Sequence, residues 1–65
     1  MRNQINTIVE TQTEVVDIEK NLDGTFTVVC YFEYNNYEKK FNCEEEAHSW
    51  GMTKFVQELH KERCN

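Results

Sequence analysis

The chain has 65 residues, with twelve acidic against seven basic side chains and a net charge of −5. A chain this short buries only about 60% of the surface that its unfolded form exposes, so we expect one small domain over residues 1–65. The acidic balance disfavours attraction to nucleic acid and to anionic membranes, because both need an excess of Lys and Arg. It would suit a basic partner, and it would equally serve solubility alone.

The three cysteines, Cys30, Cys43 and Cys64, are an odd number without paired spacing. This pattern favours reduced thiols over a disulfide framework. No apolar run is long enough to cross a bilayer, and no signal peptide precedes the first strand. We therefore expect a cytoplasmic protein without a membrane contact. The hydrophobic content of 38% is too high for a disordered chain.

Residues 7–20 are rich in Thr, Val and Ile, the residue types that favour a pleated sheet. The sequence predicts one long first strand over this range. A strand of this length often carries a bulge or bend. The polar middle, from Glu10 to Glu14, is where we expect it.

Asn21-Leu22-Asp23-Gly24 has the form of a type I turn followed by a glycine in the left-handed region. Such a turn makes a three-residue hairpin loop, and the loop length fixes the register. Ile18 should then lie opposite Val28, and Val16 opposite Cys30. This register keeps the charged residues of the first strand out of the core.

The second strand is expected over residues 25–34 and the third over residues 37–41. Asn35-Asn36 joins them as a two-residue turn, because Asn tolerates a positive φ better than most residues. This turn predicts that Phe32 pairs with Lys39.

A helix is expected over residues 44–63. Three glutamates in its first turn suit the positive end of the helix dipole, and Asn42 or Cys43 precedes them as a cap. Residues spaced about 100° apart give an apolar arc of Ala47, Gly51, Met52, Phe55, Val56 and Leu59. Trp50 lies roughly 60° outside this arc, either folded over the sheet rim or exposed as a contact residue.

The predicted fold is α+β, a three-stranded antiparallel sheet with one C-terminal helix packed on one face. This architecture has little room for a pocket, and Cys30 faces the core, so we expect no enzyme activity. Cys43 and His48 lie roughly 20 Å along the helix from His60 and Cys64. We therefore expect no metal site and no cofactor.

The outer face of the predicted sheet has no second helix to cover it. It is either an ordinary open sheet face or a partner-binding surface, including a dimer interface. By alternation it carries Thr11, Thr13, Val15, Asp17, Thr27, Val29, Tyr31, Glu33, Glu38 and Lys40.

Phe41, Glu46, Ala47 and Trp50 have the spacing of a strand-to-helix junction that resembles two related families. These are the integrase amino-terminal arm-binding domains and the plant ethylene-response-factor DNA-binding domains. The resemblance implies DNA binding, with the outer sheet face entering the major groove. Groove binding needs cations for phosphates, and that face offers only Lys40, so its charges disfavour this activity.

We therefore expect a small acidic, non-enzymatic protein-binding module with a basic or nucleic-acid-binding protein partner. In character it is similar to the anti-CRISPR and DNA-mimic proteins with which phages and mobile elements inhibit host nucleases and defence complexes. The alternatives are an integrase-arm-type DNA-binding domain and a structural homodimer. The expected partner-binding residues are Glu10, Glu14, Val15, Asp17, Val29, Tyr31, Glu33, Glu38, Lys40 and Trp50.

Overall fold

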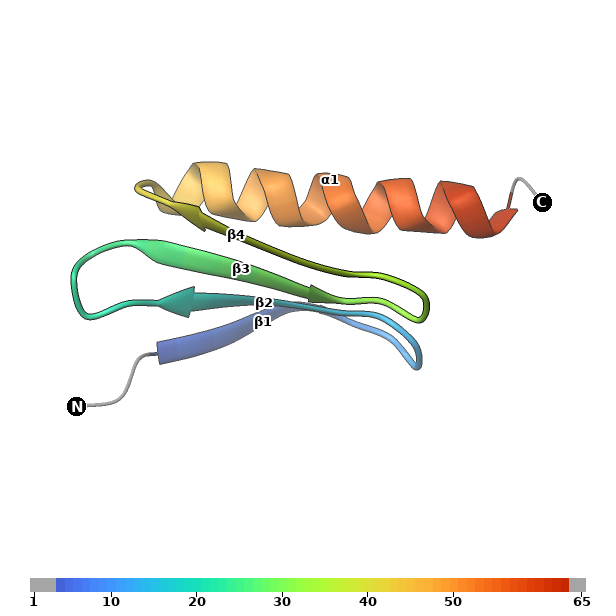
Figure 1. The fold of residues 1–65 in the computed structure, drawn as a ribbon, viewed down its shortest axis with the longest axis horizontal. Coiled ribbons are helices and arrows are strands. Elements are labelled where there is room, and N and C mark those ends of the chain that lie inside the picture. Colours follow the sequence, from blue (N-terminus) through green and yellow to red (C-terminus); the bar gives the residue numbers. More distant parts are fainter. Residues whose placement is uncertain (1–3, 64–65) are drawn as a thin grey trace.

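The computed structural model describes residues 4–63, with the side chains of residues 5–61. An antiparallel sheet of four strands, paired in chain order, carries one C-terminal helix on one face (Figure 1). The α+β class and the C-terminal helix are confirmed, whereas the expected number of three strands is wrong. The elements are β1 (Gln4–Glu10), β2 (Val15–Lys20), β3 (Phe26–Tyr31), β4 (Asn36–Phe41) and α1 (Glu44–Arg63).

The predicted long first strand is two strands, because the chain reverses at residues 11–14. Thr11 closes this turn. Its backbone N–H donates to the Glu14 carbonyl at 2.8 Å, and its Oγ1 accepts from the Glu14 N–H at 2.9 Å. A Thr hydroxyl can replace backbone partners in this way without Gly or Pro in the turn. The polar stretch was the right place for an interruption, but a complete reversal replaces the expected bend.

A bulge lies in β1 rather than in the polar stretch. The pairing of β1 with β2 shifts between Thr7 and Val9, which leaves Ile8 as the extra residue. Ile8 and Val9 both pack against the buried core. A bulge permits this, because two residues of one strand then oppose a single residue of its neighbour.

The β2–β3 hairpin has the predicted register, with Ile18 opposite Val28 and Val16 opposite Cys30. Gly24 has a φ of +90°, the left-handed conformation that the turn requires. Its N–H donates to the Asn21 carbonyl at 3.1 Å. The three-residue loop is therefore confirmed.

The β3–β4 turn lies two residues earlier than predicted. Glu33 and Tyr34 form the loop, since the Phe32 N–H donates to the Asn35 carbonyl at 2.9 Å. Lys39 therefore pairs with Val28 rather than with Phe32. No residue other than glycine has a positive φ in the part of the chain described, so the tolerance of Asn for that conformation is not used. The shift moves β4 by an even number of residues and leaves each side chain on its predicted face.

The core lies between the sheet and α1, which contacts β3 more than any other strand. Ala47 and Gly51 face the sheet and are buried, whereas Val56 of the predicted apolar arc is 46% exposed. Figure 1 shows that the last part of α1 extends beyond the turns at the end of the sheet. The fully or nearly buried apolar residues are Val16, Ile18, Val28, Cys30, Phe32 and Ala47.

Candidate protein-binding face

Among residues 4–63, no helix or strand packs on the sheet face opposite α1. We call it the open face and define it by the side chains that cross-strand pairing places on that side. None of these side chains is buried, in contrast to Val16, Ile18, Val28 and Cys30 on the other side of β2 and β3. The open face comprises Ile5, Thr7, Glu10, Val15, Asp17, Glu19, Thr27, Val29, Tyr31, Asn36, Glu38 and Lys40.

Carboxylates dominate the charge of the open face. Glu10, Asp17, Glu19 and Glu38 lie there against the single cation Lys40. They come from β1, β2 and β4, so the negative charge extends across the width of the sheet.

Three apolar side chains of the open face, Val15, Val29 and Tyr31, lie on the two inner strands of the sheet. Val15 pairs directly with Tyr31, and Val29 lies on the same strand as Tyr31, two residues away. Tyr31 is 51% exposed. An exposed aromatic ring beside aliphatic side chains, bordered by charges, is a common composition for the centre of a protein interface.

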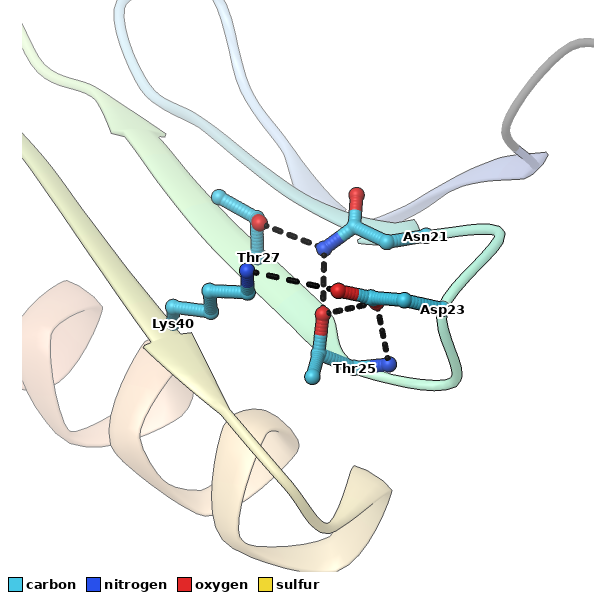
Figure 2. Close-up of polar contacts among 5 residues, drawn as sticks. All are labelled: Asn21, Asp23, Thr25, Thr27 and Lys40. Atoms are coloured by element: carbon cyan, nitrogen blue, oxygen red, sulfur yellow. Dashed lines mark hydrogen bonds and ion pairs between the residues drawn. The ribbon is translucent and has the colours of Figure 1, made fainter.

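A polar network fixes one end of the open face (Figure 2). The Asn21 side-chain amide donates to Thr25 Oγ1 at 3.0 Å and to Thr27 Oγ1 at 2.9 Å. Asp23 Oδ1 accepts from the Thr25 hydroxyl at 2.6 Å and from the Thr25 N–H at 3.0 Å. These bonds tie the β2–β3 loop to the first residues of β3.

Lys40 is held within the same network. Its Nζ lies 3.6 Å from Asp23 Oδ2. Hydrogen bonds from Thr25, reinforced by the Lys40 charge, lower the pKa of the Asp23 carboxyl. The stabilisation from this carboxylate is present above the pKa of an unfolded aspartate and is lost as the pH falls through the lowered value. The single cation of the open face thus already has an anionic partner.

The structure brings together most of the residues expected to bind a partner. Seven of them share the open face: Glu10, Val15, Asp17, Val29, Tyr31, Glu38 and Lys40. Glu33 instead lies in the β3–β4 turn. Thr11 and Thr13, expected on the outer face, lie in the β1–β2 turn.

Glu14 is not on the surface. Only 3% of it is exposed, so its expected place among the accessible acids is wrong. It lies in the β1–β2 turn, two residues before the buried Val16. Strand alternation therefore places it on the core side of the sheet, like Val16. Glu58 of α1 is equally buried, and its Oε1 lies 3.5 Å from the Asn35 amide nitrogen.

Trp50 lies on the opposite side of the sheet from the open face. It is half-buried, and its ring packs on Phe41 at the end of β4, with a centroid distance of 5.7 Å. Of the two predicted positions, the sheet rim is therefore the observed one. Trp50 and Tyr31 do not contribute to one flat surface.

Sequence reasoning missed Glu19, Ile5 and Thr7 of the open face. Glu19 follows Asp17 by two residues, and strand alternation would have placed it there. The β1 residues could be assigned only once the turn at residues 11–14 was known. The Thr7 hydroxyl then donates to Asp17 Oδ1 at 2.7 Å, directly across the β1–β2 pair.

Cys30 faces the core, on the other side of the sheet from the open face. Burial raises the pKa of the Cys30 thiol to about 11, so it is a neutral core side chain at physiological pH. Within residues 4–63 no three His, Cys, Asp or Glu side chains are grouped as a metal site would need. Over the same residues, α1 is not apolar enough to cross a membrane.

No protein-family profile, curated protein or solved structure matches this chain. The site therefore has to be interpreted from its own geometry and charge.

Proposed function

We propose that this chain is a non-enzymatic protein-binding module whose open face binds a basic surface of a protein partner in the cytoplasm. One observation carries the proposal. The uncovered sheet face presents Glu10, Asp17, Glu19 and Glu38, while its single cation is paired with Asp23 inside the chain. Complementary charge accelerates encounter with a cationic surface and disfavours other partners.

The same charges argue against DNA as the ligand. Affinity for DNA depends on cations that displace counterions from phosphates. Lys40 is the cation among the described side chains of the open face, and it lies 3.6 Å from Asp23. They also argue against face-to-face pairing of two copies, because each copy would bring its carboxylates against those of the other. A basic protein surface satisfies these carboxylates.

A partner that binds nucleic acid fits this chemistry best. Its cationic groove is adapted to phosphate, and a surface of spaced carboxylates can occupy the same groove. On this basis we assign the chain to the class of phage or mobile-element inhibitors that block a host nuclease or a defence complex. Val15, Val29 and Tyr31 would supply the apolar centre of the contact.

Affinity purification from a bacterial lysate at about 150 mM salt, followed by mass spectrometry, tests the proposal. The open-face variant Glu10→Gln/Glu38→Gln should lose the captured partner, because two exposed carboxylates without an internal partner are removed. Asp17 is left unchanged, since it accepts a hydrogen bond from Thr7. The recovered partner should be basic, and the wild-type chain should displace duplex DNA from it.

The matched control is Glu33→Gln/Glu44→Gln, which removes the same charge from residues outside the open face. It should retain the partner. Equal loss of the partner in both variants would mean that net charge alone explains the binding. Direct DNA binding in a mobility-shift assay at moderate salt would favour the integrase-arm activity instead. A stable dimer in sedimentation would favour the structural homodimer.

A further inference from the structure

A groove separate from the open face lies between the end of β4 and the first half of α1. It is an open depression with a volume of about 580 Å³. Its lining combines aromatic rings with carboxylates, and comprises Phe41, Glu45, Glu46, Ser49, Trp50 and Thr53.

The aromatic part of the groove is held in place by packing. Phe41 and Trp50 are half-buried, and their ring planes meet at 54°. Ring faces are electron-rich and attract cations. Two ammonium groups of this chain already show the attraction: Lys39 Nζ lies 5.4 Å from the Phe41 centroid, and Lys54 Nζ lies 5.6 Å from the Trp50 centroid. Neither lysine lines the groove.

The polar part of the groove is acidic, and the residues that line it include no lysine or arginine. Glu45 and Glu46 are exposed on successive positions of the first turn of α1. Within residues 4–63 the ion pair observed is Lys40 with Asp23, so neither groove carboxylate has a cationic partner there.

We propose that this groove binds an arginine side chain of a protein partner. A guanidinium is planar, so it can stack on an aromatic ring while its N–H groups donate to a carboxylate. The groove offers both contacts side by side, with Trp50 and Phe41 as the rings and Glu45 and Glu46 as the acceptors. An anionic ligand would be repelled, and an apolar segment would desolvate the carboxylates without compensation. The proposal does not depend on the open face, because β4 separates the two sites.

The test uses the indole signal of Trp50, the one tryptophan of the chain. A short capped oligo-arginine peptide is titrated into the ¹⁵N-labelled protein, and the indole N–H resonance is followed. It should shift saturably. Glu45→Gln/Glu46→Gln should weaken the peptide affinity about tenfold, and circular dichroism should show an unchanged fold. Trp50→Phe, followed by calorimetry, should retain most of the affinity, because it keeps an aromatic face.

A matched variant, Glu33→Gln/Glu44→Gln, loses two carboxylates that belong neither to the groove nor to the open face. It should change the affinity measured at the indole by less than about twofold. A tenfold loss in this variant would overturn the groove as the site. An equal indole shift with an oligo-glutamate peptide would also overturn the proposal. An indole shift that depends on protein concentration alone would overturn it too, because a second copy of the chain would then be the occupant. A failure of this kind leaves the proposed function of the open face intact.

Discussion

Two glutamates, Glu14 of the β1–β2 turn and Glu58 of α1, are almost completely buried, each with 3% exposure. Glu58 has the Asn35 amide nearby, whereas Glu14 Oε2 has no hydrogen-bond partner in the described part of the chain. A buried charge without a partner costs free energy, because no protein group replaces the water that it loses. Glu14 is therefore a weak point in an otherwise apolar core.

Replacing this carboxylate by its neutral amide should stabilise the protein. We expect Glu14→Gln to raise the free energy of unfolding by about 1 kcal/mol, because a neutral amide is less costly to bury than a charge. Urea denaturation measures the change. Glu10→Gln is the control, since it removes the same charge from an exposed position and should stay within about 0.5 kcal/mol of wild type. Equal changes in the two variants would mean that repulsion across the whole chain is responsible.

Cys30 should make stability depend on pH in the alkaline range. Burial raises the pKa of its thiol from 9.0 to about 11. An unfolded cysteine loses its proton first, so the stability that burial provides is complete below pH 9 and falls between pH 9 and 11. Denaturation of wild type and Cys30→Val across this range tests the expectation. The free energy of unfolding of the variant should fall less steeply with pH than that of the wild type. Parallel pH dependences of the two proteins would contradict the expectation.

At the scale of elements, α1 lies close against the sheet at Gly51. A Cβ at this position would lie 2.9 Å from a Val16 methyl carbon, 3.2 Å from one of Val28 and 3.3 Å from Ile8 Cδ1. Val16 and Val28 are fully buried, so either side chain could give way only by repacking its neighbours. Glycine here permits close packing, although it is a poor helix former.

Gly51→Ala should therefore destabilise the protein, even though alanine favours a helix by about 1 kcal/mol. We expect a net loss of about 1–2 kcal/mol in thermal or urea denaturation, because overpacking outweighs the propensity. Combining it with Val16→Ala should recover about 1 kcal/mol relative to the sum of the single changes. A more stable Gly51→Ala protein would show that the helix shifts without cost.

Some of the turns between these elements could be predicted from the sequence, and others could not. Asp23-Gly24 specified the β2–β3 register, because only a glycine suits the left-handed position. The turn at Thr11 carries no comparable signal, since a side-chain hydroxyl closes it. Asn35-Asn36 offered a plausible turn, but an earlier loop allows Phe32 to reach the core while Asn35 caps the hairpin. The open face followed from alternation, whereas burial of Glu14 depended on packing of the whole chain.

At the scale of the whole molecule, the open face leaves a large part of one sheet uncovered in a small protein. Its acids should keep two such faces apart in solution. We expect the wild-type chain to sediment as a monomer at low salt. Glu10→Gln/Glu19→Gln/Glu38→Gln should associate at lower protein concentration, because Val15, Val29 and Tyr31 are then no longer bordered by charge.

The matched variant Glu33→Gln/Glu44→Gln/Glu45→Gln loses as much charge from residues outside the open face. It should sediment like the wild type. Association of both variants to the same extent would mean that net charge alone, and not its position on the sheet, keeps the chains apart.

The strand order β1-β2-β3-β4 has a consequence for how the chain folds. Each strand pairs with its neighbour in sequence, so every loop that must close within the sheet is short, and folding of such local topologies is fast. The β2–β3 hairpin has the best-defined turn and lies at the centre, which makes it the natural nucleus. We expect β4 and α1 to condense on it, and β1 to join last, because β1 is the strand that contacts α1 least.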